Sequence, residues 1–184
     1  MAIGRSAAVF GGAGFIGCHF LRRLAQLGRY AKLYSVDIAE PRFTDGGIQY
    51  INFDVRNPIP AQLCGDGPFD IFNFAAVHTT PGHEDWEYYW TNVHGATNVC
   101  RFAGDVGTDY LLFTSTMMVY GPTEVPKDED ALLEPVNAYA AARKSLPRAT
   151  AIPMANGPPF ATLNHFAADL GLPSESESPR IGIR

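Results

Sequence analysis

Seven residues near the N-terminus, GGAGFIG at 11–17, constrain the fold of this chain more than any other feature. A short apolar run over residues 6–10 precedes them, and apolar residues at helical spacing follow as far as residue 27. The local order is therefore strand, glycine-rich turn, helix. A turn of this kind places the amides of a helix N-terminus against an anion. The segment predicts the phosphate-binding start of an α/β domain.

Three glycines in this turn, Gly11, Gly14 and Gly17, have the spacing G-x-x-G-x-x-G. The first suits the tight turn, the second lets backbone approach a pyrophosphate, and the third lets the helix pack closely against the strand. Phe15 and Ile16 open the helix, so their amides are expected to face the same anion. A merely flexible turn is the alternative. The strand before and the helix after favour a dinucleotide site.

Two acidic residues end the next two apolar runs. Asp37 follows Gly17 by 20 residues, where a carboxylate accepts hydrogen bonds from the ribose hydroxyls of NAD and repels a ribose phosphate. A surface aspartate is the other interpretation, and Arg42 nearby leaves NADP open. Asp54 either lies in a solvated turn or faces the adenine.

The remaining apolar runs define the expected fold class. Strands are predicted at 33–38, 48–53, 69–77 and 110–116, with a helix over 86–104. Strands that alternate with helices and lack hairpin turns imply parallel pairing, right-handed crossovers and helices on both faces. We expect an α/β domain: a Rossmann-type doubly wound parallel sheet of about five strands.

Four further motifs carry a family resemblance: NFAA at 73–76, TNVHGATNV at 91–99, FTSTMMVYG at 113–121 and PVNAYAAARK at 135–144. With the glycine turn, they resemble in order the extended short-chain dehydrogenase/reductase family, which includes UDP-galactose 4-epimerase and the sugar-nucleotide dehydratases. The resemblance covers about residues 6–145. It implies an NAD-binding Rossmann domain over residues 1–145 that oxidises a sugar hydroxyl by hydride transfer to NAD. Hydroxysteroid and flavanol substrates also occur in the family and stay open.

The resemblance also implies roles for single residues. It makes Gly11, Gly14 and Gly17 the pyrophosphate loop and Asp37 the ribose acid, and it implies that Asp54 and Val55 contact the adenine. By the same resemblance, Ala75 and Ala76 lie beneath the nicotinamide ribose, and Asn92 is the helix asparagine.

The catalytic residues follow from the same resemblance. Thr116 falls at the position of the family's catalytic Ser or Thr and orients the substrate hydroxyl. Tyr139 falls at that of the catalytic tyrosine, which borders the cofactor and takes the hydroxyl proton as a phenolate.

The basic residue after this tyrosine departs from the family pattern. The family has a lysine four residues on, where its charge lowers the tyrosine pKa and its amine binds the nicotinamide ribose. Here Arg143 holds that position, and Lys144 is turned about 140° around the helix from Tyr139 rather than about 40°. Arg143 brings positive charge to the correct face, but its planar fork is not interchangeable with an ammonium. The alternative to an enzyme is therefore a non-catalytic NAD-binding remnant or regulatory module.

The chain changes character after residue 145. Residues 146–184 contain six prolines between Pro147 and Pro179 and one helical stretch at about 160–172, so an atypical, poorly ordered tail is expected. They do not resemble the strands and substrate domain that the family implies. A frameshift or gene-model error shortly after Tyr139 is one hypothesis that explains both this change and the displaced lysine.

The composition limits the classes of partner that this chain is expected to bind. A net charge of −5, a pI near 5.4 and scattered basic residues argue against nucleic acid. The N-terminus is typical of neither a signal peptide nor a membrane span, so we expect no membrane partner and a cytoplasmic location. A nucleotide sugar is the expected small-molecule substrate, and a homodimer stays open.

Several residues are set aside as structural. Cys18, Cys64 and Cys100 lack C-x-x-C spacing and are interpreted as small buried hydrophobes. His78, His83 and Glu84 lie close together but lack a third ligand at helical spacing, so no metal is expected. The aromatic run at 86–90 is interpreted as helix packing or a subunit contact.

Overall fold

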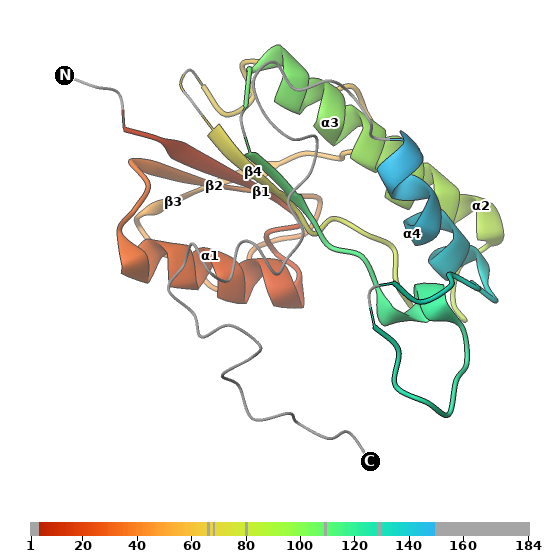
Figure 1. Cartoon of the computed structure of the whole chain (residues 1–184). Helices are drawn as coiled ribbons and strands as arrows, with labels where there is room; N and C mark the ends of the chain where they lie inside the picture. The colour runs from red at the N-terminus through yellow and green to blue at the C-terminus, as the bar shows by residue number, and fades with distance from the viewer. Residues whose placement is uncertain are drawn as a thin grey trace.

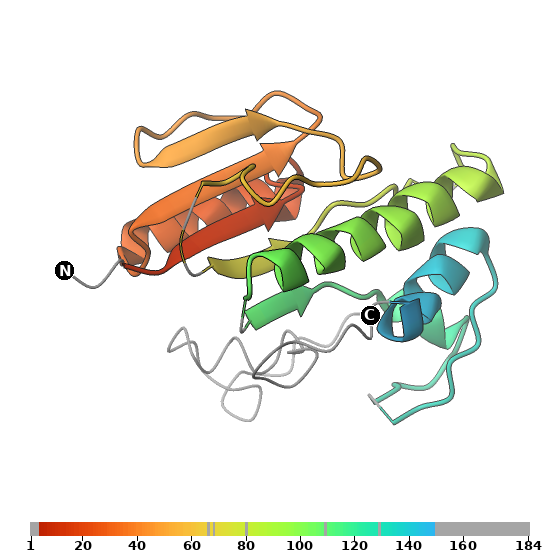
Figure 2. The same cartoon turned by 90° about the horizontal axis from the view of Figure 1, so that it is seen from above.

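The computed structural model describes residues 4–65, 67, 69–79, 81–108, 110–128 and 130–149, without the side chains of 146–149. Its centre is a parallel sheet with the strand order β3-β2-β1-β4-β5. The strands are β1 Ser6–Phe10, β2 Lys32–Asp37, β3 Ile48–Asn52, β4 Phe69–Asn73 and β5 Tyr110–Phe113. Their arrowheads all point to the same side in Figure 2. The expected Rossmann-type fold is confirmed.

Helices lie on both faces of this sheet (Figure 1). Helix α1, Phe15–Leu27, covers one face, and a long helical run crosses the other. That run consists of α2 Asp85–Tyr88, the π-helical segment η1 Tyr89–Gly95, and α3 Ala96–Asp105. A 3-10 helix, η2 Met117–Tyr120, follows β5, and α4 Ala138–Ala149 packs against η1, α2 and η2.

The core explains why β1 is so apolar. β1 is the middle strand, and every residue of it is buried. Ala7 and Val9 face α1 in one cluster, whereas Ala8 and Phe10 face α3 in the other. A strand buried on both faces needs apolar residues at each position rather than at alternate positions. The uninterrupted run at 6–10 is thereby explained.

Two predicted strands are too long. β4 ends at Asn73 rather than at residue 77, because its neighbour β1 ends at Phe10, the residue that pairs with Asn73. The Asn73 side chain then accepts a hydrogen bond from the Ala75 amide (3.1 Å), which turns the chain. β5 likewise ends at Phe113 rather than at residue 116. Apolar character continues past these points, but the partner strands do not.

Other expectations meet mixed outcomes. The three cysteines are free and buried, as expected. In the aromatic run Tyr88 is buried, in agreement with helix packing, whereas Trp86 and Trp90 are 63% and 46% exposed, so the other interpretation, a subunit contact, stays a prediction for these two. Among the described residues, no helix has the length and apolarity needed to cross a membrane.

The expected helix at 160–172 and most of the tail lie outside the described residues, and α4 continues past the expected boundary at 145.

Candidate functional site

The glycine turn lies at the carboxyl end of β1, between β1 and α1. Gly11 has a φ of +80°, and its amide donates to the carbonyl of Val36 (2.8 Å). A Cβ on Gly11 would lie 2.4 Å from the amide nitrogen of Ala75. Both the backbone conformation and the close approach of the segment after β4 therefore require glycine here.

The N-terminus of α1 is open to an anion. Gly14 is the N-cap and offers no side-chain cap, and the first turn carries no acidic residue. The first helical hydrogen bond runs from Cys18 to the Gly14 carbonyl (2.9 Å). The amides of Phe15, Ile16 and Gly17 therefore have no acceptor within the helix and are available to phosphate oxygens.

Asp37 joins the end of β2 to this turn. One carboxylate oxygen accepts a hydrogen bond from the Ala13 amide (2.9 Å), and the other accepts one from the Ala39 amide (3.0 Å). The carboxylate is half-buried and fixed in orientation. Two carboxylate oxygens offer about four lone pairs, so acceptor capacity is left for a ribose diol beside the turn.

At the end of β3, Asp54 already has a protein partner. Arg56 forms a two-point ion pair with it (2.6 and 2.9 Å), and these hydrogen bonds lower the pKa of Asp54. The Val55 side chain is buried against Gly95, where an added Cβ would lie 2.9 Å from it, and the Val55 carbonyl accepts from the Asn98 amide group (2.9 Å). The Val55 side chain is therefore buried, and its carbonyl already accepts one hydrogen bond.

The segment after β4 is held by Asn92. Ala75 passes directly over Gly11, and Ala76 follows it in the same segment. Asn92 lies in η1, is 1% exposed, and forms two hydrogen bonds with Val77: its amide oxygen accepts from the amide (2.9 Å) and its amide nitrogen donates to the carbonyl (2.9 Å). The Asn92 side chain thus satisfies both backbone groups of Val77 in the segment after β4 has ended.

Thr116 and Tyr139 lie on two elements that pack together. Thr116 is the N-cap of η2, with its hydroxyl oxygen accepting from the Met118 amide (3.3 Å). Tyr139 lies in the first turn of α4, which contacts η2 and η1. Tyr139 is 8% exposed, and its ring lies 6.2 Å from the ring of Tyr88.

Arg143 and Lys144 point to different surroundings. Arg143 is 3% exposed, and its guanidinium lies 5.1 Å from the Phe113 ring centre and 5.7 Å from that of Tyr139. Its Nε and Nη1 have no hydrogen-bond partner within the described part of the chain, and burial lowers the pKa of Arg143. Lys144 is exposed and donates to the Leu133 carbonyl (2.8 Å). The structure thus places Arg143, and not Lys144, beside Tyr139.

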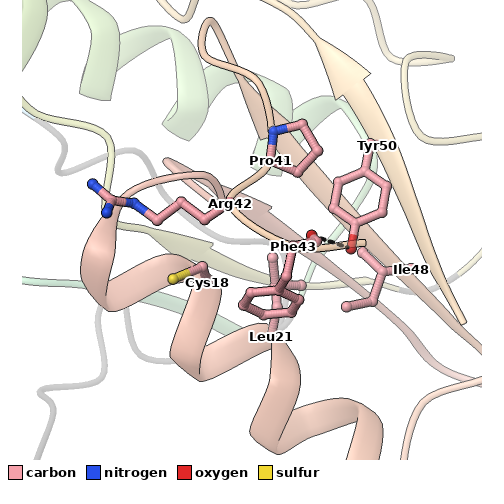
Figure 3. A pocket seen from close by; sticks show the side chains of 8 residues that line it. Cys18, Leu21, Pro41, Arg42, Phe43, Ile48 and Tyr50 are labelled. Atoms are coloured by element: carbon pink, nitrogen blue, oxygen red, sulfur yellow. Dashed lines mark hydrogen bonds between the residues drawn. The ribbon is translucent and has the colours of Figure 1, made fainter. Parts of the chain in front are cut away.

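A small cavity lies below the glycine turn, between α1 and the segment that follows β2 (Figure 3). It is lined by Gly12, Cys18, Leu21, Pro41, Arg42, Phe43, Ile48 and Tyr50. Its volume of about 10 Å³ has room for about one water molecule, far below the roughly 300 Å³ of a typical ligand pocket. We therefore interpret it as a packing gap that is separate from the reacting groups.

His83 is not part of a metal cluster in the described residues, where no three His, Cys, Asp or Glu side chains converge. Its Nδ1 lies 3.4 Å from a carboxylate oxygen of Glu87. Glu84 and Glu87 instead form a capping box at the start of α2. These side chains have a local structural explanation.

Sequence reasoning missed the residues that hold the site together. Asn73, Asn98 and Arg56 contact the segments that carry Ala75, Val55 and Asp54. The one signal for Arg56 was its place two residues after an aspartate, at a strand end. For buried asparagines, position at helical spacing from apolar residues gives only a weak signal.

The fold and this site define a dinucleotide-binding α/β protein. The chain belongs to the NAD dependent epimerase/dehydratase family, whose family model matches residues 7–153. NAD is the cofactor on which this family depends.

Curated relatives support the family. A UDP-glucose 4-epimerase from Lactobacillus helveticus is 27% identical over 165 residues, which are 86% of this chain and 50% of the relative. A 3 beta-hydroxysteroid dehydrogenase/Delta 5-->4-isomerase from Monkeypox virus is 29% identical over 64% of this chain and 35% of its own length. The chain spans about half the length of the epimerase.

Solved structures are also similar to this chain. A crystal structure of UDP-galactose 4-epimerase matches with a TM-score of 0.66 and 28% identity, covering 76% of this chain and 48% of that one. MoeE5 in complex with UDP-glucose and NAD matches with a TM-score of 0.69 at 24% identity, covering 79% and 48%. The second likeness, at this level of identity, concerns the fold.

Proposed function

We propose that this chain binds NAD and belongs to a sugar-nucleotide epimerase or dehydratase that oxidises a sugar hydroxyl. The observation that carries the proposal is the bond between Asp37 and the Ala13 amide (2.9 Å), which joins a ribose-binding acid to a phosphate-binding turn. Gly11, Gly14 and Gly17, with the amides of Phe15 and Ile16, would hold the pyrophosphate. Asp54, Val55, Ala75, Ala76 and Asn92 complete the proposed cofactor site.

The proposed chemistry uses two hydroxyl groups of this chain. Thr116 would orient the sugar hydroxyl, and Tyr139 would take its proton. NAD, when bound, accepts the hydride from the sugar carbon. Arg143 supplies a positive charge beside Tyr139. The nucleotide part of the substrate is proposed from the relatives, which include UDP-glucose 4-epimerases.

A second candidate is an NAD-binding module without turnover. It is favoured by Lys144, which is turned away from Tyr139 and bonded to the Leu133 carbonyl. The buried Arg143 has unbonded nitrogens but a planar group in place of an ammonium. Under this candidate, cofactor binding is retained and hydride transfer is lost.

One experiment separates the candidates. NAD is titrated into the purified chain by calorimetry, and UDP-glucose is then added while absorbance at about 340 nm reports reduced cofactor. We expect NAD binding. Absence of binding contradicts both candidates, whereas reduction of the cofactor supports the enzyme alone.

The remaining parts of the proposal concern the location and the oligomeric state of the protein. We propose a cytoplasmic location, and we leave the homodimer as the form to test. Sedimentation analysis with and without NAD measures the mass in solution directly.

A further inference from the structure

The peptide groups around Ala13 are held from three directions. The Ala13 amide donates to Asp37 (2.9 Å), and the Gly14 amide donates to the Gly11 carbonyl (3.2 Å). The carbonyl of Ala13 accepts from Nε of Arg42 (3.2 Å). The peptide that joins Ala13 to Gly14 is therefore fixed at its oxygen by Arg42 and at its nitrogen by Gly11.

Fixing this peptide matters for an anion site. A carbonyl oxygen that turned toward a pyrophosphate would repel it, whereas amide groups attract it. Arg42 keeps the Ala13 oxygen engaged at the side of the turn. The next amides along the chain, from Phe15 to Gly17, then form the open N-terminus of α1.

Arg42 is presented by an anchored segment. The Tyr50 hydroxyl accepts from the Asp45 amide (3.0 Å) and donates to the Phe43 carbonyl (3.2 Å). The guanidinium of Arg22 lies 5.9 Å from the ring centre of Phe43. In Figure 3 the Arg42 side chain turns away from Phe43, and its guanidinium lies beside the N-terminal end of α1. The last residue of β2, Asp37, and the segment after β2, which carries Arg42, thus reach the same turn.

We propose that Arg42 is a positioning residue of the phosphate-binding turn, which holds the Ala13 peptide in the orientation that NAD binding requires. The proposal rests on the proposed function only for the identity of the ligand. The effect on the turn itself is a property of the protein without cofactor. In this proposal Arg42 has a role in the turn itself, beyond lying near Asp37 or contacting NADP.

The test compares Arg42→Met, Arg42→Lys and Arg23→Met. Arg23 is an exposed arginine of α1, and its replacement removes the same charge without touching Ala13. Calorimetry with NAD should show about fivefold weaker binding for Arg42→Met, since a charged hydrogen bond is lost at an exposed site. Arg42→Lys retains a charged donor and should recover to within about twofold of the wild type, as should the control.

Hydrogen exchange without NAD supplies a second readout. Arg42→Met should speed exchange of the Ala13 and Gly14 amides about fivefold, while Arg23→Met leaves them unchanged. Unchanged exchange in Arg42→Met overturns the proposal, whatever its NAD affinity. Faster exchange in a protein that fails to bind NAD supports the role of Arg42 and contradicts the proposed function instead.

Discussion

At the scale of single residues, Asp37 has two tasks that a sequence motif does not separate. It is the expected acceptor for the ribose, and it already holds the Ala13 amide in the absence of any ligand. A neutral replacement of similar shape distinguishes the tasks. Asparagine keeps an oxygen acceptor for Ala13 but removes the negative charge.

We predict that the chain binds NAD more tightly than NADP, and that Asp37→Asn lowers this preference about tenfold, because repulsion of the ribose phosphate is removed. Titration of both cofactors into both proteins measures the ratio. Equal or tighter binding of NADP by the wild type would show that the role given to Asp37 is wrong.

Cys64 provides a prediction about reactivity. Burial raises the pKa of its thiol to about 12, so almost none is thiolate near pH 8 in the folded protein. Iodoacetamide should label Cys64 at that pH only after the chain is unfolded in urea, as read by peptide mass spectrometry. Rapid labelling of Cys64 in the native protein would contradict its buried position.

The same thiol affects stability at high pH. Its pKa in the folded protein lies above the ordinary value of 9.0, so the unfolded chain loses the proton first. The contribution of the protonated Cys64 thiol to the unfolding free energy is complete below pH 9 and is lost progressively as the pH rises from 9 toward 12. Cys64→Ala should therefore flatten the fall in melting temperature over this alkaline range.

At the scale of elements, apolar runs predicted that five strands exist, and the glycine turn predicted how the first one connects to its helix. They could not predict where β4 ends, because that depends on the length of β1, its partner in space. Nor could helical spacing reveal the π-helical segment that places Asn92 against Val77. Such features arise from contacts between elements, which one run of sequence does not contain.

The site residues also divide into those that the sequence predicts and those that depend on contacts between elements. Gly11, Gly14, Gly17 and Asp37 are close in sequence to the strand ends that position them, so their clustering was predictable. The separation of Arg143 and Lys144 was also predictable, because both lie on one helix with a known angular step. The bond from Lys144 to the Leu133 carbonyl was not, since it depends on the path of a loop.

The packing of α1 on the glycine turn yields a prediction about stability. A Cβ on Gly17 would lie 2.1 Å from the Gly11 carbonyl oxygen, and backbone cannot yield as a side chain does. Gly17→Ala should cost about 1–3 kcal/mol of unfolding free energy and weaken NAD binding. Gly46→Ala is the matched control, because an added Cβ there meets nothing within 4 Å. Equal urea midpoints for the two variants would contradict this packing.

At the scale of the whole molecule, the described sheet ends at β5, which has a neighbour on one side only. Leu111 and Leu112 of this strand are buried by α3 and α1 packing. This chain spans about half the length of the relatives that it matches. The unpaired backbone groups of an edge strand favour association, so we expect the purified chain to aggregate on heating, which light scattering measures.

The last prediction is that this chain, as written, turns over UDP-, GDP- or dTDP-sugars weakly or not at all even when NAD is bound. Substrate binding energy is what orients a reacting hydroxyl, and loss of orientation costs several orders of magnitude in rate. The cavity beside the glycine turn has room for about one water molecule rather than for a nucleotide sugar. Beside Tyr139, the ammonium of the family pattern is replaced by a buried guanidinium, while Lys144 is bonded elsewhere.

Steady-state assays with each sugar nucleotide and added NAD measure this directly, with Tyr139→Phe as the control for background. The wild type and this variant should give the same low rate, because Lys144 is bonded to the Leu133 carbonyl and Arg143 offers Tyr139 a planar guanidinium in place of an ammonium. Arg143→Lys, which restores an ammonium at the family position, should keep NAD binding and leave turnover low, since the new lysine adds no contact that orients the sugar. Rapid turnover that Tyr139→Phe abolishes would instead mean that Arg143 serves in place of the lysine, and that a partner supplies the substrate site.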